Sequence, residues 1–176
     1  MAITPQAGDF VLVDIRNIAG TLIHIGQILN GDGFGHYEHA AIYDGSGGLY
    51  EATPEGGIEH NPLSEYDPKS LFWSTGIVFP TAAERVSIVA TAHNCLGVDY
   101  SFLDYFALAA HRFHIWAPGL KRYIGTTKHM ICSQFVDFCY NAAGYQLFTD
   151  GRWPGYVTPG DLDQLLTSTS GLEFTK

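Results

Sequence analysis

Runs of apolar residues separated by turn sequences dominate the first half of the chain. Residues 9–15 contain four consecutive apolar side chains, which predicts a short buried strand. Residues 39–44 and 49–53 form two further runs, and the glycine-rich segment 45–48 between them is typical of a β-hairpin. A turn follows the second run, and residues 71–79 are rich in β-forming side chains, which predicts another strand.

Helical patterns occupy much of the remaining chain. The predicted helices cover residues 18–29, 81–96, 101–113, 132–143 and a segment that begins at Thr158 and Pro159. Thr81 and Glu84 form a capping-box sequence, and Gly97 and Gly144 are residues that end helices. The order of a strand, a helix, several antiparallel strands and then helices is typical of the α+β class. We therefore expect an antiparallel β-sheet packed against helices.

Composition favours a single folded domain. The chain has 176 residues, and domains typically contain about 100–200, so residues 1–176 are predicted to form one unit. Hydrophobic residues make up 46% of the chain and charged residues only 15%. The charged fraction is below the usual level of about 25%, which excludes a disordered chain and predicts a dense core.

Charge and hydropathy argue against two kinds of partner. The 18 acidic and 9 basic residues give a formal net charge of −9, and the basic residues form no cluster. We expect no nucleic-acid partner, because phosphate binding needs a basic face. No transmembrane segment is predicted, because no apolar run reaches about 18 residues. The first residues lack a signal-peptide pattern. We therefore expect either a cytoplasmic location or release by a route that does not use a signal peptide. The oligomeric state is not predicted.

Cys132 is the first candidate for chemistry. It lies at the predicted start of helix 132–143, where backbone N–H groups and the helix dipole favour a thiolate and an oxyanion. Its position alone also fits a small buried hydrophobic residue, which is our interpretation of Cys95 and Cys139. Three cysteines argue against a disulfide framework, and the absence of a Cys-x-x-Cys pair argues against a thiolate zinc site.

A thiolate nucleophile needs a base, and the base needs an orienting group. His39 opens the strand 39–44, which places it at the rim of the sheet. Glu51 follows twelve residues later in the paired strand. A four-residue turn would place Glu51 opposite Ile42 and facing away from His39, whereas a three- or five-residue turn or one bulge would place both on one face. The sequence leaves this pairing open.

Other polar and aromatic residues suggest weaker candidates. Tyr37 lies two residues before His39 and is our candidate for binding a substrate carbonyl or amine group. His111 and His114 are one helical turn apart but lack an evident third ligand, so we expect no metal site. The aromatic segment 100–116 is predicted to form a core helix and a lid, with an acyl-chain surface as the alternative.

Three strings resemble the circularly permuted branch of the NlpC-type papain-fold cysteine hydrolases. They are His-Ala-Ala-Ile-Tyr-Asp-Gly from His39, Leu-Tyr-Glu-Ala-Thr-Pro-Glu-Gly-Gly-Ile from Leu49, and Cys-Ser-Gln-Phe-Val-Asp-Phe-Cys-Tyr-Asn-Ala-Ala-Gly from Cys132. The bacterial members of this branch are the YiiX/YebB-like proteins, and the lecithin-retinol acyltransferase-like enzymes are more distant. The resemblance extends from about residue 8 to residue 162, while segments 30–38 and 106–125 have no placed counterpart.

The resemblance implies a permuted papain-like fold and a role for each candidate. Cys132 would be the nucleophile, and His39 the general base and then the general acid. Glu51 would orient the imidazole and favour its charged form. No metal or organic cofactor is implied.

The function implied by this resemblance is that of a thiol hydrolase. It would cleave an amide bond through an acyl-enzyme on Cys132, with cell-wall (peptidoglycan) peptides as the favoured substrate. The expected partner is therefore a peptide or acyl substrate. The alternatives are a lipid acyl hydrolase or acyltransferase of the same fold, a catalytically silent binding module, and a protein-modifying effector.

Overall fold

The computed structural model describes residues 4–14, 37–53, 56–98, 131–150 and 157–172. The predicted helices 18–29 and 101–113 lie outside these residues. So do the aromatic segment 100–116, with its two histidines, and most of the segment 30–38.

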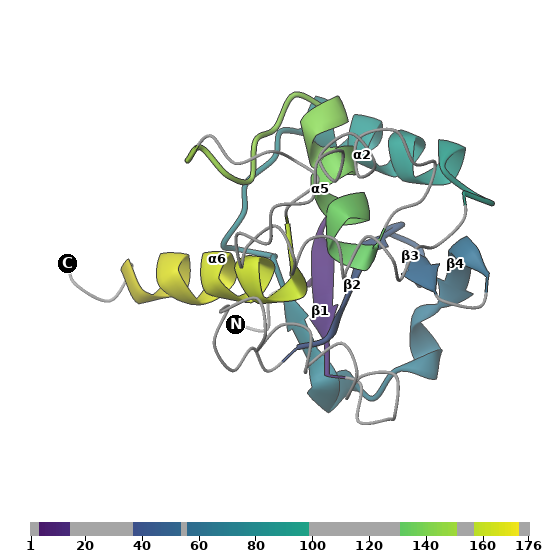
Figure 1. Cartoon of the computed structure of the whole chain (residues 1–176), viewed down its shortest axis with the longest axis horizontal. Helices are drawn as coiled ribbons and strands as arrows, with labels where there is room; N and C mark the ends of the chain where they lie inside the picture. Colours follow the sequence, from purple (N-terminus) through teal and green to yellow (C-terminus); the bar gives the residue numbers. More distant parts are fainter. Residues whose placement is uncertain (1–3, 15–36, 54–55, 99–130, 151–156, 173–176) are drawn as a thin grey trace, which may run out of the picture.

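A five-stranded antiparallel sheet forms the centre of the described structure (Figure 1). Its strands lie in the order β4-β3-β2-β1-β5. Their bounds are β1 (Phe10–Val13), β2 (His39–Tyr43), β3 (Gly48–Thr53), β4 (Gly57–Pro62) and β5 (Leu71–Trp73). The hairpin of β2 and β3 and the first strand confirm the sequence prediction, and the antiparallel sheet with its helices confirms the α+β class.

Two strands differ from the prediction. Strand β4 was missed because Ile58 is its only large apolar residue, and the strand lies at an edge of the sheet. It nevertheless pairs with β3 along its whole length, from Thr53 opposite Gly57 to Gly48 opposite Pro62. Strand β5 ends at Trp73 rather than at residue 79, because the chain then turns.

The turn after β5 has a clear geometric cause. The N–H groups of Ile77 and Val78 both donate to the carbonyl oxygen of Ser74, at 3.0 and 2.9 Å. Gly76, with φ of 79°, supplies the left-handed backbone conformation between them. The apolar residues in this segment therefore enter a turn and do not extend the sheet.

The helices begin and end close to where their sequence signals predicted. They are α2 (Ala82–Asn94), α5 (Cys132–Ala142) and α6 (Pro159–Leu172). Thr81 Oγ1 accepts from the N–H of Glu84 at 3.3 Å, and Glu84 Oε2 accepts from the N–H of Thr81 at 2.6 Å. Two short 3-10 helices, Leu63–Glu65 and Pro68–Ser70, connect β4 to β5. None of the helices in the described ranges is both long and apolar enough to cross a bilayer.

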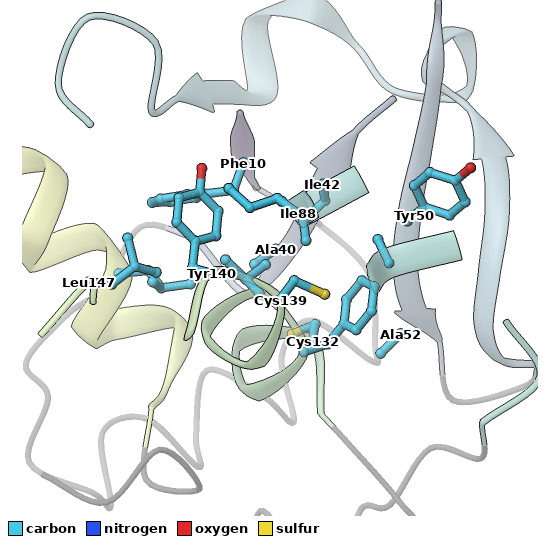
Figure 2. Close-up of a cluster of buried hydrophobic side chains, with 14 of the residues drawn as sticks. Phe10, Ala40, Ile42, Tyr50, Ala52, Ile88, Cys132, Cys139, Tyr140 and Leu147 are labelled. Carbon is cyan, nitrogen blue, oxygen red and sulfur yellow. The ribbon is translucent and has the colours of Figure 1, made fainter. Parts of the chain in front are cut away.

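The two faces of the sheet bury different sets of side chains. Helices α5, α2 and α6 contribute to the core on one face, and Figure 2 shows part of that cluster. Strand residues at alternating positions, such as Ala40 and Ile42, point into it. The intervening residues Val11, Val13 and Ala41 face the other side, which is covered by the connection between β4 and β5. A side chain on one of these strands therefore reaches one core or the other according to its position.

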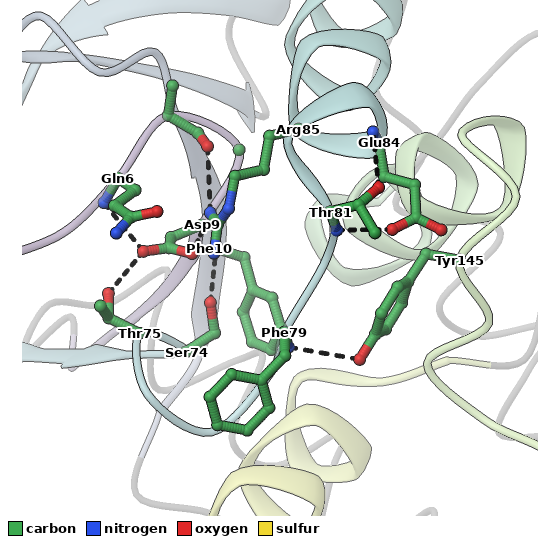
Figure 3. Close-up of polar contacts among 12 residues, drawn as sticks. Gln6, Asp9, Phe10, Ser74, Thr75, Phe79, Thr81, Glu84, Arg85 and Tyr145 are labelled. Carbon is green, nitrogen blue, oxygen red and sulfur yellow. Dashed lines mark hydrogen bonds and ion pairs between the residues drawn. The ribbon is translucent and has the colours of Figure 1, made fainter.

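A buried ion pair links the residue before β1 to α2 (Figure 3). Arg85 Nη1 lies 2.5 Å from Asp9 Oδ1, and the Asp9 side chain is fully buried. Asp9 Oδ2 also accepts from Thr75 Oγ1 at 2.6 Å and from the N–H of Gln6 at 2.9 Å. On the neighbouring helix α5, Tyr140 donates its hydroxyl proton to the carbonyl oxygen of Gly8 at 2.7 Å. These contacts fix both helices relative to the sheet.

Candidate active site

The register of the β2–β3 hairpin places His39 and Glu51 on the same face. Tyr43 pairs with Leu49, which leaves a five-residue connection, and Ala41 lies directly opposite Glu51. His39 is two residues from Ala41 on the same strand, so Glu51 is its diagonal neighbour. Of the alternatives that the sequence left open, the structure therefore has a turn with an odd number of residues, which places both side chains on one face.

Asp44 holds this turn in place. Its Oδ1 accepts from the N–H groups of Ser46 at 2.6 Å and of Gly48 at 2.9 Å. Burial raises the pKa of Asp44, but hydrogen bonds from Ser46, Gly48 and His60 outweigh it and lower this pKa to about 2. Gly45 and Gly47 have φ of 88° and 103°, a conformation that other residues rarely adopt. The turn length is therefore set by a specific Asp and Gly pattern.

Strand pairing brings the predicted histidine and carboxylate into direct contact. His39 Nε2 lies 2.5 Å from Glu51 Oε2, and the two residues are 6% and 1% exposed. The carboxylate also accepts from two residues that the sequence analysis did not identify. Asn61 Nδ2 donates to Oε1 at 2.9 Å, and the hydroxyl of Tyr66 donates to Oε2 at 2.5 Å. Every oxygen of Glu51 thus has a hydrogen-bond donor.

Asn61 and Tyr66 were missed for different reasons. Asn61 lies on β4, two residues from the position opposite Glu51, so it could be found only once that strand was recognised. Tyr66 follows the first 3-10 helix, where no periodic pattern indicates which way a side chain points. The nearest sequence signal is the position of both residues shortly after Glu51 in the chain.

The hydrogen bonds to Glu51 decide its charge. Burial raises the pKa of the carboxyl group, but the hydrogen bond and charge of His39 act in the opposite direction. Hydrogen bonds from Tyr66 and Asn61 lower it further, and the net pKa lies below the ordinary value. Glu51 is therefore an anion at neutral pH.

The imidazole of His39 interacts with both Glu51 and Cys132. Burial lowers its pKa, but hydrogen bonding to Cys132 and Glu51, together with their charges, raises it from 6.5 to about 10. Because Nε2 contacts Glu51, the second ring nitrogen, Nδ1, is available for the hydrogen bond with Cys132. The structure thus brings together all three residues that were predicted to be catalytic.

Cys132 is the first residue of α5, as predicted. Its side chain is 1% exposed and belongs to the core cluster that α5 forms on the sheet (Figure 2). Gln134 Oε1 accepts from the N–H of Ile131, the residue before the helix, at 3.3 Å. Ser133 donates its hydroxyl proton to the carbonyl oxygen of Val157 at 2.7 Å. The first turn of α5 is therefore anchored on both sides of the cysteine.

Tyr37 lies at the start of the described segment that leads into β2. Its ring is half-buried and stacks on Phe72, with centroids 5.6 Å apart. Burial and the charges of Asp163 and Asp14 raise the pKa of its hydroxyl group. The role of Tyr37 in substrate binding stays a prediction.

The two other cysteines are buried away from solvent. Cys95 and Cys139 are 8% and 0% exposed and belong to the same core cluster. They interact with each other, and burial raises the pKa of Cys139 far above the ordinary range of thiols. Within the described segments, no group of three or more His, Cys, Asp and Glu side chains has an arrangement that could hold a metal ion.

Comparisons with known proteins bear on the fold. No family model matches the chain, and no curated protein matches it either. Among solved structures, the chain is similar to the crystal structure of the metalloprotein yiiX from Escherichia coli O157:H7, DUF1105. The TM-score is 0.54 at 18% sequence identity, and the match covers 86% of this chain and 78% of the other. The chain therefore has an α+β fold like that of yiiX, as the sequence resemblance led us to expect.

Proposed function

We propose that this protein is a cysteine hydrolase of the permuted papain-like, NlpC-type branch, with Cys132 as its nucleophile. One observation carries the proposal: a buried histidine contacts a buried carboxylate at 2.5 Å and also interacts with a cysteine at a helix N-terminus. A nucleophile, a base and a group that orients the base are the components of a thiol-hydrolase site.

The charges of the site suit this chemistry. With a pKa of about 10, His39 is an imidazolium ion at neutral pH. An imidazolium ion beside Cys132 stabilises negative charge on the sulfur atom, and so does the N-terminal end of α5. Glu51 stabilises the imidazolium ion from the opposite side of the ring.

The reaction follows from these positions. The Cys132 thiolate attacks the carbonyl carbon of an amide, and backbone N–H groups at the start of α5 stabilise the oxyanion. His39 donates a proton to the leaving amine as the C–N bond breaks, which leaves a thioester on Cys132. Neutral His39 then accepts a proton from water, the water attacks the thioester, and the carboxylic acid departs. The net reaction consumes one amide and one water and produces one acid and one amine.

The favoured substrate is an amide bond in peptidoglycan peptides, which follows from the family resemblance. The similar solved structure is described as a metalloprotein. No step of our mechanism passes through a metal. In the described structure, the Glu51 carboxylate is hydrogen-bonded to His39 Nε2, Asn61 and Tyr66.

A substrate panel tests the proposal. Purified protein, Cys132→Ala and His39→Ala would be incubated with muropeptides, acyl esters and acyl amides, and products would be identified by mass spectrometry. We expect new amine and acid termini from muropeptides with the wild-type protein only. Turnover of acyl esters without muropeptide cleavage would replace the substrate class with lipids. No turnover, together with a Cys132 that reacts no faster than a free thiol, would overturn the enzyme proposal.

A further inference from the structure

Tyr66 interacts with both His39 and Glu51. Its hydroxyl group donates to Glu51 Oε2 at 2.5 Å, the oxygen that also contacts His39. Its ring lies nearly parallel to the imidazole of His39, with an interplanar angle of 22° and centroids 6.5 Å apart. The N–H of Tyr66 donates to the carbonyl oxygen of Leu63 at 3.1 Å, which fixes the backbone at this point.

The other groups around Glu51 come from β2 and β4. His39 and Asn61 face the carboxylate with their donors. Glu59 lies directly opposite Glu51 on β4, but its carboxylate accepts from the hydroxyl of Thr53 at 2.6 Å. Glu51 therefore depends on its own donors, His39, Asn61 and Tyr66, to stay ionised.

The burial of Glu51 makes each of those donors important. The residue is 1% exposed, so water cannot easily replace a lost hydrogen bond. A buried carboxyl group that lacks donors tends to take up a proton. A protonated Glu51 would no longer attract the imidazolium ion of His39, and the charge that supports Cys132 would be lost.

Tyr66 is suited to act as a permanent donor. Burial raises the pKa of its hydroxyl group, and so do the charge and hydrogen bond of Glu51 and the charges of Glu65 and Cys132. The hydroxyl group therefore keeps its proton at every pH at which the site could work.

We propose that Tyr66 is a positioning residue that holds the Glu51 carboxylate ionised and aligned, so that His39 stays charged beside Cys132. The inference rests on the proposed function, because Tyr66 acts through Glu51 and His39 and not on the reacting atoms. It assigns a role to a residue outside the predicted triad.

The test compares Tyr66→Phe with Tyr145→Phe. Each change removes one hydroxyl group. The hydroxyl of Tyr145 accepts a hydrogen bond from the N–H of Phe79 at 3.3 Å, and neither residue belongs to the proposed site. The pKa of Glu51 would be measured by NMR of its carboxyl carbon, and the rate of Cys132 alkylation would be measured as a function of pH. In Tyr66→Phe we expect the pKa of Glu51 to rise by about one to two units, as for loss of one hydrogen bond to a charged group.

The alkylation profile gives an independent readout. Its acid limb should move to higher pH in Tyr66→Phe, and its alkaline limb should stay in place. In a Glu51→Gln background the same substitution should have no further effect, because its target is gone. In the wild-type protein, an NMR signal of the Tyr66 hydroxyl proton should shift as Glu51 titrates, which requires no variant.

Three results would overturn the role of Tyr66. They are an unchanged Glu51 pKa in Tyr66→Phe, an equal shift in Tyr145→Phe, and a full effect of Tyr66→Phe in the Glu51→Gln background. Failure of the proposed function would look different. In that case wild-type Cys132 would react no faster than a free thiol, while the Glu51 titration, which needs no turnover, would still decide the role of Tyr66.

Discussion

Replacing Glu51 with glutamine should lower the pKa of His39. The substitution keeps the size of the side chain but removes the negative charge that lies 2.5 Å from Nε2. Glu59→Gln is a matched control, because Glu59 sits opposite Glu51 on β4 and is bonded to Thr53 instead of His39.

The expected size of the effect follows from the environment of His39. Its pKa is raised from 6.5 to about 10, a difference of about 3.5 units or about 5 kcal/mol. Burial opposes this shift, while Cys132 and Glu51 each contribute hydrogen bonding and charge. Because burial lowers the pKa, Cys132 and Glu51 together raise it by more than about 3.5 units. If they contribute about equally, removing either one should lower the pKa by more than about 1.75 units, to about 8 or below. In the double variant only burial remains, so the pKa should fall below 6.5.

NMR titration of the imidazole signals is the suitable assay. The chain has eight histidines, and His39 would be assigned from the signal that is absent in His39→Gln. The reasoning would be refuted if the pKa of His39 in Glu51→Gln equalled that of wild type. It would also be refuted if Glu59→Gln produced the same decrease, or if the double variant kept a pKa above 6.5.

Three further predictions concern reactivity and stability. Native protein treated with iodoacetamide at pH 7 should be labelled at Cys132 and not at Cys139, because burial raises the pKa of Cys139; peptide mass spectrometry reads this, and equal labelling of both would contradict it. The pKa of His39 is higher in the folded protein, so its stabilising contribution is complete below pH 6.5 and is lost as the pH rises through about 10. The melting temperature should therefore fall between pH 7 and pH 10, and this fall should be smaller in His39→Gln. Arg85→Met should lower the free energy of unfolding by about 3 kcal/mol, because it leaves buried Asp9 without its cation; urea denaturation measures this, and a change below about 1 kcal/mol would show that Thr75 and Gln6 suffice.

Local patterns predicted the elements whose signals lie within a few residues. The capping box at Thr81 and the glycines at positions 97 and 144 marked helix ends where the structure has them. The start of α5 at Cys132 was predicted in the same way. These features depend on hydrogen bonds between residues that are close in the sequence, so local residue patterns are enough to predict them.

Features that depend on distant contacts could not be predicted. Strand β4 has little apolar character, and it forms because β3 offers an unpaired edge. Without β4 there was no means of placing Asn61 beside Glu51. The contact of Tyr66 with the same carboxylate depends on how the connection after β4 folds back over the sheet. The pairing of His39 with Glu51 stayed open because a turn longer or shorter by one residue would place Glu51 on the other face of the sheet.

The length of the turn between β2 and β3, which is a surface loop, determines whether the buried site can form. Tyr43 and Leu49 close a five-residue connection, and strand side chains alternate between the two faces. An insertion or deletion of one residue in this connection would turn the Glu51 side chain to the other face of the sheet. The site would be lost although every one of its residues would still be present in the sequence. Natural variants of this chain should therefore keep Asp44 and the glycines of this turn, and they should carry no single-residue indel there. In distant relatives, the length of this loop is thus a marker of an intact site, together with the Asp and Gly residues that set it.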